Sequence, residues 1–577
     1  MIFLACACSL FAGCKHNASS NIRLNQLGFS PMQEMTATIV LDEPTAGTTT
    51  NVVITNGNND TVWVGVPAVS MCNPISGKPC QIVDFSALDT VGTYTMYVTE
   101  GQRQSQCSFT ISEHPYRELT RAALRAYYHQ RASMATEEPY AEGYARPAGH
   151  PDNRVLVHAS AATAERPEGT EIDSHGGWYD AGDYNKYIVN SGFTMGVWLM
   201  AYEFNKAYFD TLKLNIPETT LAVPDMLAEA MYNIRWMMTM QDTDGGVYHK
   251  LTEPDFEGFI RPDQCKKPRY VVLKTTAAAL DFAATMALAA RVYAPYEKVY
   301  PGFVAEATEA ARRAYTWAMA NPAIYYDQPK MNDQFKPAIT TGAYDDFDVR
   351  DEFYWAATEL YLLTGEETYK SEMINHKSQI TEFSPAVWGN VAELAYLDLL
   401  MHNEQPITKD PLLNHLEPYL NEASTISVFR SPYGNRESDF FWGCNSEGCC
   451  WRGIECLYAY RLTGDRKYLV NAERCLNFIL GQNATGFCYV TGFGTNPTNH
   501  PHHRLSYSHP KGTLPGFLAG GPNPARQDAE TDGVKYPKDV PADESYLDYQ
   551  PSYASNEVTI NWNVTLFALS AGLDALE

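Results

Sequence analysis

Two similar segments about 100 residues apart constrain the fold of this chain more than any other feature. "LYLLTGEETY" covers residues 360–369, and "AYRLTGDRKY" covers residues 459–468. In each, an apolar helical run ends at a glycine, where helices commonly close in the left-handed conformation, and an acidic residue then opens the next helix. Repeated units of this kind predict a closed ring of helical hairpins whose loops gather at one end.

Helical spacing of apolar residues runs through most of the chain after residue 112. Three segments show it most clearly, and we expect each to be a helix: 275–293, 303–320 and 390–402. The loops richest in Gly, His, Trp and Tyr are 173–190, 241–250, 438–448, 489–510 and 540–556. In a ring of hairpins these loops would line a cleft.

The segment before residue 113 has a different period. Runs of β-branched or alternating residues are separated by Gly, Asn, Asp and Pro, at 35–41, 51–57, 61–66 and 92–101. Short strands at this spacing predict an immunoglobulin-like β-sandwich. With 577 residues, of which 45% are hydrophobic, the chain is long enough for several domains. We expect a sandwich over residues 20–112 and a helical domain over residues 113–577.

Residues 1–19 are predicted to be an export segment. An apolar run ends in "LFAGC", and small residues before Cys14 are typical of a bacterial lipoprotein signal, although no Lys or Arg precedes the run. An ordinary signal peptide is the alternative. We therefore expect an exported protein, either a periplasmic or cell-surface lipoprotein anchored at Cys14 or a secreted one.

The charge balance bears on the ligand. The net charge of −25 comes from 43 basic and 68 acidic residues. Without a basic patch, nucleic acid is excluded as a partner, and a neutral or cationic ligand is favoured. The acidic excess is equally explained by solubility.

The cysteines follow no metal-binding spacing. Cys72 and Cys80 bracket a turn-rich loop and are candidates for a disulfide. Four others, at 444, 449, 450 and 456, lack the paired CxxC pattern of a structural zinc site, and we expect buried thiols.

Three loop motifs carry the chemistry. "GGWYDAGDYNKY" (176–187) places Asp180 and Asp183 three residues apart, which suits two acids that hold one water or a cation, or else an ordinary turn. "GTNPTNHPHHR" (494–504) gathers histidines and an arginine, which suit hydroxyl recognition better than zinc. "YLDYQPSYASNEVTINWN" (546–563) contains Asp548 and Glu557; Glu557 is alternatively a first-turn acid of the last helix, with Ser555 or Asn556 as its cap.

Together these motifs predict a carbohydrate-cleaving site. Sugar faces are apolar and stack on aromatic rings, whereas sugar hydroxyls bind Asp, His and Arg. Glycosidic cleavage requires one carboxylic acid that protonates the leaving oxygen and one carboxylate that acts on water or on the anomeric carbon. Asp180, Asp183 and Glu557 fill these roles.

At these motifs the sequence resembles glycoside hydrolase family 9, in the bacterial branch with an N-terminal immunoglobulin-like domain. The resemblance implies an all-α (α/α)6 barrel and hydrolysis of β-1,4-glucan with inversion. It implies that Asp183 is the base, that Asp180 helps to hold the attacking water and that Glu557 is the acid. His502 and Asp548 are the further active positions.

The resemblance also implies subsite residues and cofactors. The substrate-binding candidates are Arg504, His249, Trp355, Trp442 and Tyr553, with both tryptophans alternatively in the core. No cofactor is required and a structural calcium is compatible, but zinc is not predicted, because Gly149 stands where relatives have a cysteine.

We expect a monomeric endo-β-1,4-glucanase that binds a β-glucan polysaccharide or oligosaccharide. The alternatives are an exo-acting cellodextrinase or exo-β-glucosaminidase of the same family. From another class, the alternative is a non-catalytic glycan-binding lipoprotein.

Overall fold

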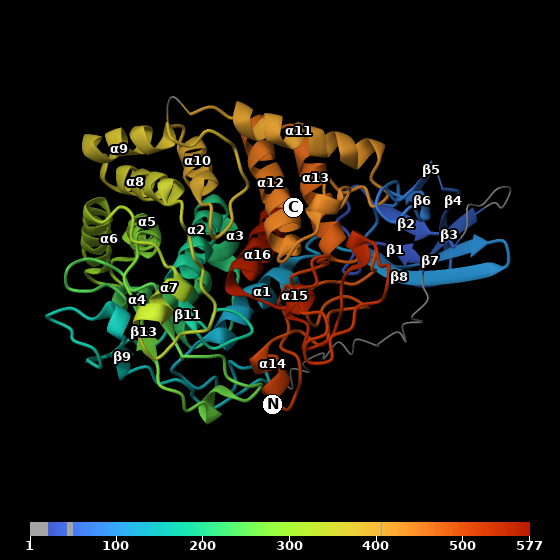
Figure 1. Cartoon of the computed structure of the whole chain (residues 1–577). Helices are drawn as coiled ribbons and strands as arrows, with labels where there is room; N and C mark the ends of the chain where they lie inside the picture. The colour runs from blue at the N-terminus through green and yellow to red at the C-terminus, as the bar shows by residue number, and fades with distance from the viewer. Residues whose placement is uncertain (1–20, 43–49, 68, 405–406, 577) are drawn as a thin grey trace, which may run out of the picture.

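The computed structural model describes residues 21–42, 50–67, 69–404 and 407–576. The predicted export segment and Cys14 lie outside these residues. The described chain forms a β-sandwich that packs against one side of a larger helical domain (Figure 1). The predicted fold class, a β-sandwich followed by a helical domain, is therefore confirmed, and the change from strand to helix lies between Ile111 and Arg117.

The sandwich consists of two four-stranded sheets, with strand orders β1-β2-β6-β5 and β4-β3-β7-β8. Their bounds are β1 Ile22–Arg23, β2 Thr36–Val40, β3 Thr50–Asn56, β4 Thr61–Gly65, β5 Val69–Cys72, β6 Pro79–Asp84, β7 Gly92–Glu100 and β8 Arg103–Ile111. All strand pairs are antiparallel. Phe29, Phe85 and Phe109 meet between the sheets and form the centre of this core.

The helical domain is a ring of paired helices (Figure 1). Inner helices, most of whose side chains are buried, are α2 (Ile188–Phe204), α5 (Thr276–Tyr293), α8 (Arg350–Thr364), α10 (Ala392–Met401), α12 (Trp451–Thr463) and α16 (Ile560–Asp574). Outer helices are α1 (Arg117–Gln130), α4 (Asp225–Thr239), α6 (Phe303–Ala320), α9 (Glu367–Lys377), α11 (Asp410–Thr425) and α13 (Arg466–Ile479). Inner and outer helices alternate along the chain, which gives the predicted (α/α)6 barrel.

Short elements fill the connections. These are α3 (Lys206–Thr211), α7 (Gln328–Gln334), α14 (Arg504–Ser508) and α15 (Tyr553–Asn556). A five-stranded sheet, which was not predicted, lies among the loops in the order β10-β9-β13-β12-β11. Its strands are β9 Val155–Val157, β10 Glu171–Ile172, β11 Lys186–Tyr187, β12 Lys250–Thr252 and β13 Tyr270–Val271.

The repeated glycines close helices as predicted. Gly365 ends α8 with φ 68° and Gly464 ends α12 with φ 71°, both left-handed. In each case the glycine N–H donates to a carbonyl four residues earlier, at 2.7 Å. The two turns therefore reverse the chain from an inner to an outer helix by the same device.

One helix of the described residues is long and apolar enough to cross a membrane, over 276–296, and 89% of its apolar window is buried inside the protein. Its alanine-rich face lets α5 pack closely against both neighbouring inner helices, so its hydropathy is that of a barrel core.

The cysteines are free thiols throughout the described chain. The expected pairing of Cys72 with Cys80 is not formed, because Cys80 lies opposite Met71 in the β5–β6 ladder. The cluster at 444, 449, 450 and 456 is buried, as predicted.

Candidate active site

The inner helices begin at the end of the ring where the three motifs meet. The Asp180–Asp183 turn leads directly into α2, and Glu557 lies just before α16. The two segments are joined by a hydrogen bond from the Ile560 N–H to the Asp180 carbonyl, at 2.8 Å. Acids about 370 residues apart in sequence are thus brought to neighbouring loops.

Asp180 and Asp183 are held by different partners. Asp180, 2% exposed, accepts hydrogen bonds from the Asn190 amide at 2.6 Å and from the Tyr344 hydroxyl at 2.7 Å, one on each oxygen. Asp183, 6% exposed, accepts on Oδ2 from Asn185 and from the Tyr187 hydroxyl, the latter at 3.1 Å. Its Oδ1 accepts no hydrogen bond from the described residues and is therefore available to a ligand or water.

Gly182 allows the aspartate turn to approach the histidine motif. A Cβ on Gly182 would lie 2.2 Å from the His502 carbonyl oxygen, which no side chain tolerates. Its own carbonyl accepts from the Arg504 backbone N–H at 3.1 Å and from Arg504 Nη1 at 2.8 Å. The glycine is required for close contact between loops, whereas Gly176 and Gly177 adopt positive φ.

Glu557 is not part of a helix. It lies between α15 and α16 with extended backbone (φ −70°, ψ 158°) and forms a parallel bridge with His502. Thr559 caps α16, so the expected cap at Ser555 or Asn556 and the alternative of a first-turn glutamate are both wrong. The extended linker turns the half-buried Glu557 carboxyl toward the aspartates.

The three acids favour protonation. Burial, together with the charge of Asp183, raises the pKa of Glu557 to about 8. Burial and the charge of Asp183 also raise the pKa of Asp180, to about 8. Burial raises the pKa of Asp183, while Arg504 opposes the rise. Glu557 is therefore protonated near neutral pH and can donate a proton.

His502 is a neutral acceptor. Its Nδ1 lies 2.9 Å from the Gln550 carbonyl oxygen, and because a carbonyl only accepts, Nδ1 carries the hydrogen. Burial and Arg504 lower the pKa of His502 to about 4. Its Nε2 has no partner among the described residues and can accept a hydrogen bond from a hydroxyl.

Arg504 and Asp548 support the loops. Arg504 donates to the carbonyls of Gly182 and Glu257, and its Nη2 donates to no described residue. Asp548 accepts from the backbone N–H groups of Asn499 and His500, at 3.0 and 2.7 Å. Asp548 thus reaches the acids only through the histidine loop that it holds.

The aromatic candidates separate into two groups. Trp442, 48% exposed, lies edge-to-face against Tyr553, and Tyr553 lies against His502, so these side chains form one wall beside Glu557. Trp355 is fully buried and its indole N–H donates to Glu359 at 3.1 Å, so it is a core residue and its subsite role was wrongly predicted.

His249 is also a framework residue. Its ring nitrogens contact the Thr275 hydroxyl at 2.9 Å and the Ala343 carbonyl at 2.8 Å, and the ring stacks on Tyr326. It is buried, so no ring nitrogen is left for substrate, contrary to the prediction. Its contact with Ala343 helps to place Tyr344 against Asp180.

Sequence reasoning missed the side chains that orient the acids, namely Asn185, Tyr187, Asn190 and Tyr344. Asn185, Tyr187 and Asn190 lie within or directly after the aspartate motif, where their polar groups were a readable signal. Tyr344 comes from a loop 160 residues later and has no such signal.

Four carboxyl groups gather at one buried position of the barrel. Asp281, Asp346, Asp351 and Glu352 are buried together, and both carboxylate oxygens of Asp281 and of Glu352 lack hydrogen-bond donors in the described chain. Burial and mutual repulsion raise their pKa values. Oxygen donors of this kind fit calcium.

Two other groups among the described residues have ligand atoms within 4.8 Å of one another: Glu203, Asp398 and His402, and His150, Glu253 and Cys265. His150 hydrogen bonds to Glu253 at 3.0 Å and to the Tyr179 hydroxyl at 2.9 Å. Cys265, which the sequence did not indicate, thus places a thiol beside His150.

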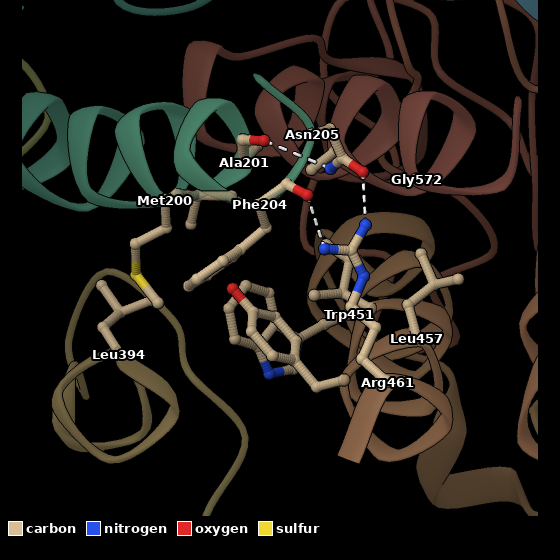
Figure 2. Close-up of a pocket in the computed structure, with 13 residues that line it drawn as sticks. Met200, Ala201, Phe204, Asn205, Leu394, Trp451, Leu457, Arg461 and Gly572 are labelled. Atoms are coloured by element: carbon tan, nitrogen blue, oxygen red, sulfur yellow. Dashed lines mark hydrogen bonds between the residues drawn. The ribbon is translucent and has the colours of Figure 1, made fainter. Parts of the chain in front are cut away.

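A small apolar cavity of about 40 Å³ lies away from the acids, beside the C-terminal halves of α2 and α16 (Figure 2). Arg461 closes one side by donating to the Phe204 carbonyl at 2.6 Å and to the Asn205 side chain. The cavity has room for only a few water molecules, so it is not the substrate site.

A barrel of paired helices, with separated carboxylic acids and exposed aromatic rings at one end, defines a polysaccharide-cleaving glycoside hydrolase. The profile of glycosyl hydrolase family 9 matches residues 116–570, and that of the cellulase N-terminal ig-like domain matches residues 17–103. The chain belongs to glycosyl hydrolase family 9 and is an endo-β-1,4-glucanase of that family.

Similar proteins cover almost the whole chain. A xyloglucan-specific endo-β-1,4-glucanase of Bacteroides ovatus is 47% identical, over 96% of this chain and 94% of its own. Endoglucanase D of Acetivibrio thermocellus is 31% identical, over 96% and 83%. A solved Bacteroides ovatus family 9 structure superposes with a TM-score of 0.90 at 45% identity, over 96% and 99%. The endoglucanase prediction is confirmed.

Proposed function

We propose that this enzyme hydrolyses β-1,4-glucan with inversion, with Asp183 as base, Asp180 as water-holding residue and Glu557 as acid. The observation that carries the proposal is the convergence of these acids on two hydrogen-bonded loops. Asp183 has a free oxygen to take a proton from water, and the raised pKa of Glu557 keeps it protonated for the leaving oxygen. Carboxyl groups supply both proton transfers, so the reaction requires no cofactor.

The inversion of the anomeric carbon and the roles of Asp183 and Glu557 are tested together. Proton NMR of fresh cello-oligosaccharide products should show the α-anomer first, and Glu557→Gln and Asp183→Asn should each lose nearly all hydrolysis while melting near the wild-type temperature. A β-anomer first would contradict inversion, and near wild-type activity in either variant would contradict its assigned role.

The preferred substrate is proposed to be xyloglucan, a branched β-1,4-glucan, because the 47% identical relative is xyloglucan-specific. Initial rates on xyloglucan, mixed-linkage glucan and carboxymethyl cellulose, with product sizes followed over time, test this. We expect random-length early products and the highest rate on xyloglucan. A higher rate on an unbranched glucan would contradict the preference.

A structural calcium is proposed at Asp281, Asp346, Asp351 and Glu352, because buried carboxylates without donors need a cation or protons. When bound, calcium would neutralise these charges beneath the Tyr344 loop. We expect a chelator to lower the melting temperature at pH 8 and added calcium to restore it. No shift would contradict the proposal.

Export with attachment at Cys14 is proposed from the sequence of residues 1–14. A monomeric state is proposed because all the candidate active-site residues come from one chain. Detergent partitioning of wild type and Cys14→Ser in a bacterial host tests the anchor. Light scattering of the soluble form tests the monomer.

A further inference from the structure

Glu447 is a carboxyl group beside the Glu557–Trp562 segment that the reaction above does not use. It lies on η6 (Asn445–Cys450), a π-helical turn that leads into α12. Such turns often occur at functional sites. Its Oε1 accepts from the Trp562 indole N–H at 3.2 Å and from the Asn561 amide at 3.5 Å. Within the described chain, Oε2 accepts no hydrogen bond and no Lys, Arg or His pairs with Glu447.

Two links hold Glu447 next to the segment of the catalytic acid. The Asn445 N–H donates to the Gly520 carbonyl at 3.0 Å, and the Gly520 N–H donates to the Glu557 carbonyl at 2.9 Å. Asn561 and Trp562, which contact Glu447, belong to the first turn of α16, directly after Glu557. The position of Glu447 relative to the reaction centre is therefore fixed by backbone as well as side-chain contacts.

Glu447 is also linked to the exposed aromatic wall. Trp562 is 4% exposed and lies edge-to-face against Trp442, with ring centroids 6.2 Å apart at 84°. A Cβ on Gly443 would lie 2.7 Å from the Trp562 ring, so that ring is tightly enclosed. A sugar ring stacked on Trp442 would thus have a rigid base, with a half-buried carboxyl group near its hydroxyl rim.

We propose that Glu447 is a substrate-binding residue whose free Oε2 hydrogen bonds to hydroxyls of the glucose residue stacked on Trp442. The ligand is a neutral β-linked hexopyranose, so the inference rests on the glucanase activity given above. Burial raises the pKa of Glu447 to about 7, and a hydroxyl can bond to either protonation state. Glu447 therefore contributes to holding the chain, and Glu557 to breaking it.

The test is steady-state kinetics of four proteins on a neutral cello-oligosaccharide at pH 7. We expect Glu447→Ala to raise KM about tenfold with kcat within about threefold of wild type, as for loss of a hydrogen bond to a charged group. Glu447→Gln should stay within about threefold in KM, because the amide can serve both partners. Trp562→Phe keeps a ring against Trp442 and removes the indole donor, so KM should also stay within about threefold.

Three outcomes would overturn the proposal. Glu447→Ala could keep the wild-type KM, it could lose kcat with no change in KM, or Trp562→Phe could raise KM as much as Glu447→Ala does. The last would make Glu447 only a support for Trp562. If Glu447→Ala does not fold, Glu447→Asp withdraws the carboxyl by one methylene, and an unchanged KM there also overturns it.

A failure of the proposed reaction can be distinguished from a failure of the proposed role of Glu447. If the wild type cleaves no β-glucan, that function fails. Calorimetric titration of the wild type and Glu447→Ala with the same oligosaccharide then decides the role of Glu447, with equal affinities overturning it.

Discussion

Gly182 shows how a single residue can decide whether the acids meet. Its hydrogen replaces a side chain that would collide with the His502 carbonyl, and its carbonyl receives both Arg504 bonds. An alanine there must push apart the loops that carry Asp183 and His502, and His502 is in turn bridged to Glu557.

We expect Gly182→Ala to lower kcat/KM by about 100-fold or more, because displacements near 1 Å cost this much in a preorganised site. Gly57→Ala, in a sandwich hairpin with no atom closer than 4.0 Å to the new Cβ, is the matched control and should retain full activity. Equal activities of the two variants on β-glucan would contradict the steric argument.

The protonation of the acids predicts a pH profile. Glu557 must be protonated, so activity should fall as pH rises through about 8, where burial and Asp183 place its pKa. Asp183 must be ionised, and because burial raises its pKa, activity should fall on the acid side above the usual aspartate range. The measurement is kcat/KM on a neutral glucan from pH 4 to 10. An alkaline limb near pH 5 would contradict Glu557 as the acid.

At the scale of elements, the ring is built from helix reversals. Gly464 ends α12 in the left-handed conformation, with no atom within 4 Å of a new Cβ, so only backbone strain would oppose a side chain. The same turn at Gly365 shows that the sequence repeat reflects a repeated backbone requirement.

We expect Gly464→Ala to lower the free energy of unfolding by about 1 kcal/mol, the lower end of the cost of a left-handed alanine. Gly464→Asn should lose less, because asparagine tolerates this conformation. Chemical denaturation of both variants measures the difference. An alanine variant at least as stable as the asparagine variant would argue against strain at this turn.

At the scale of the whole molecule, the sandwich is joined to the barrel by buried polar contacts. The Asn25 amide donates to Asn477 at 2.8 Å and to the Tyr116 hydroxyl at 3.1 Å. Arg474 donates to both oxygens of Glu34 at 2.8 Å. The two domains therefore share an interface of specific hydrogen bonds and should unfold together.

We expect Asn25→Ala to destabilise the protein by about 1–3 kcal/mol, because the partners across the interface lose a buried donor. Asn58→Ala, exposed in a hairpin of the same domain, is the control and should be neutral. Calorimetry should give one transition for both proteins. Two separate transitions in the wild type would contradict the shared unfolding unit.

The sequence alone determined the class of each domain and the order of the three motifs, because these depend on local period and on residues close in sequence. It also located Gly365 and Gly464, whose role is set within one turn. Only the tertiary structure decided which aromatic rings are exposed: Trp355 and His249 carry aromatic rings like Trp442, yet are buried. It also brought Tyr344 to Asp180 and Glu447 to Trp562, since contacts between distant loops depend on how the helices pack and leave no local pattern.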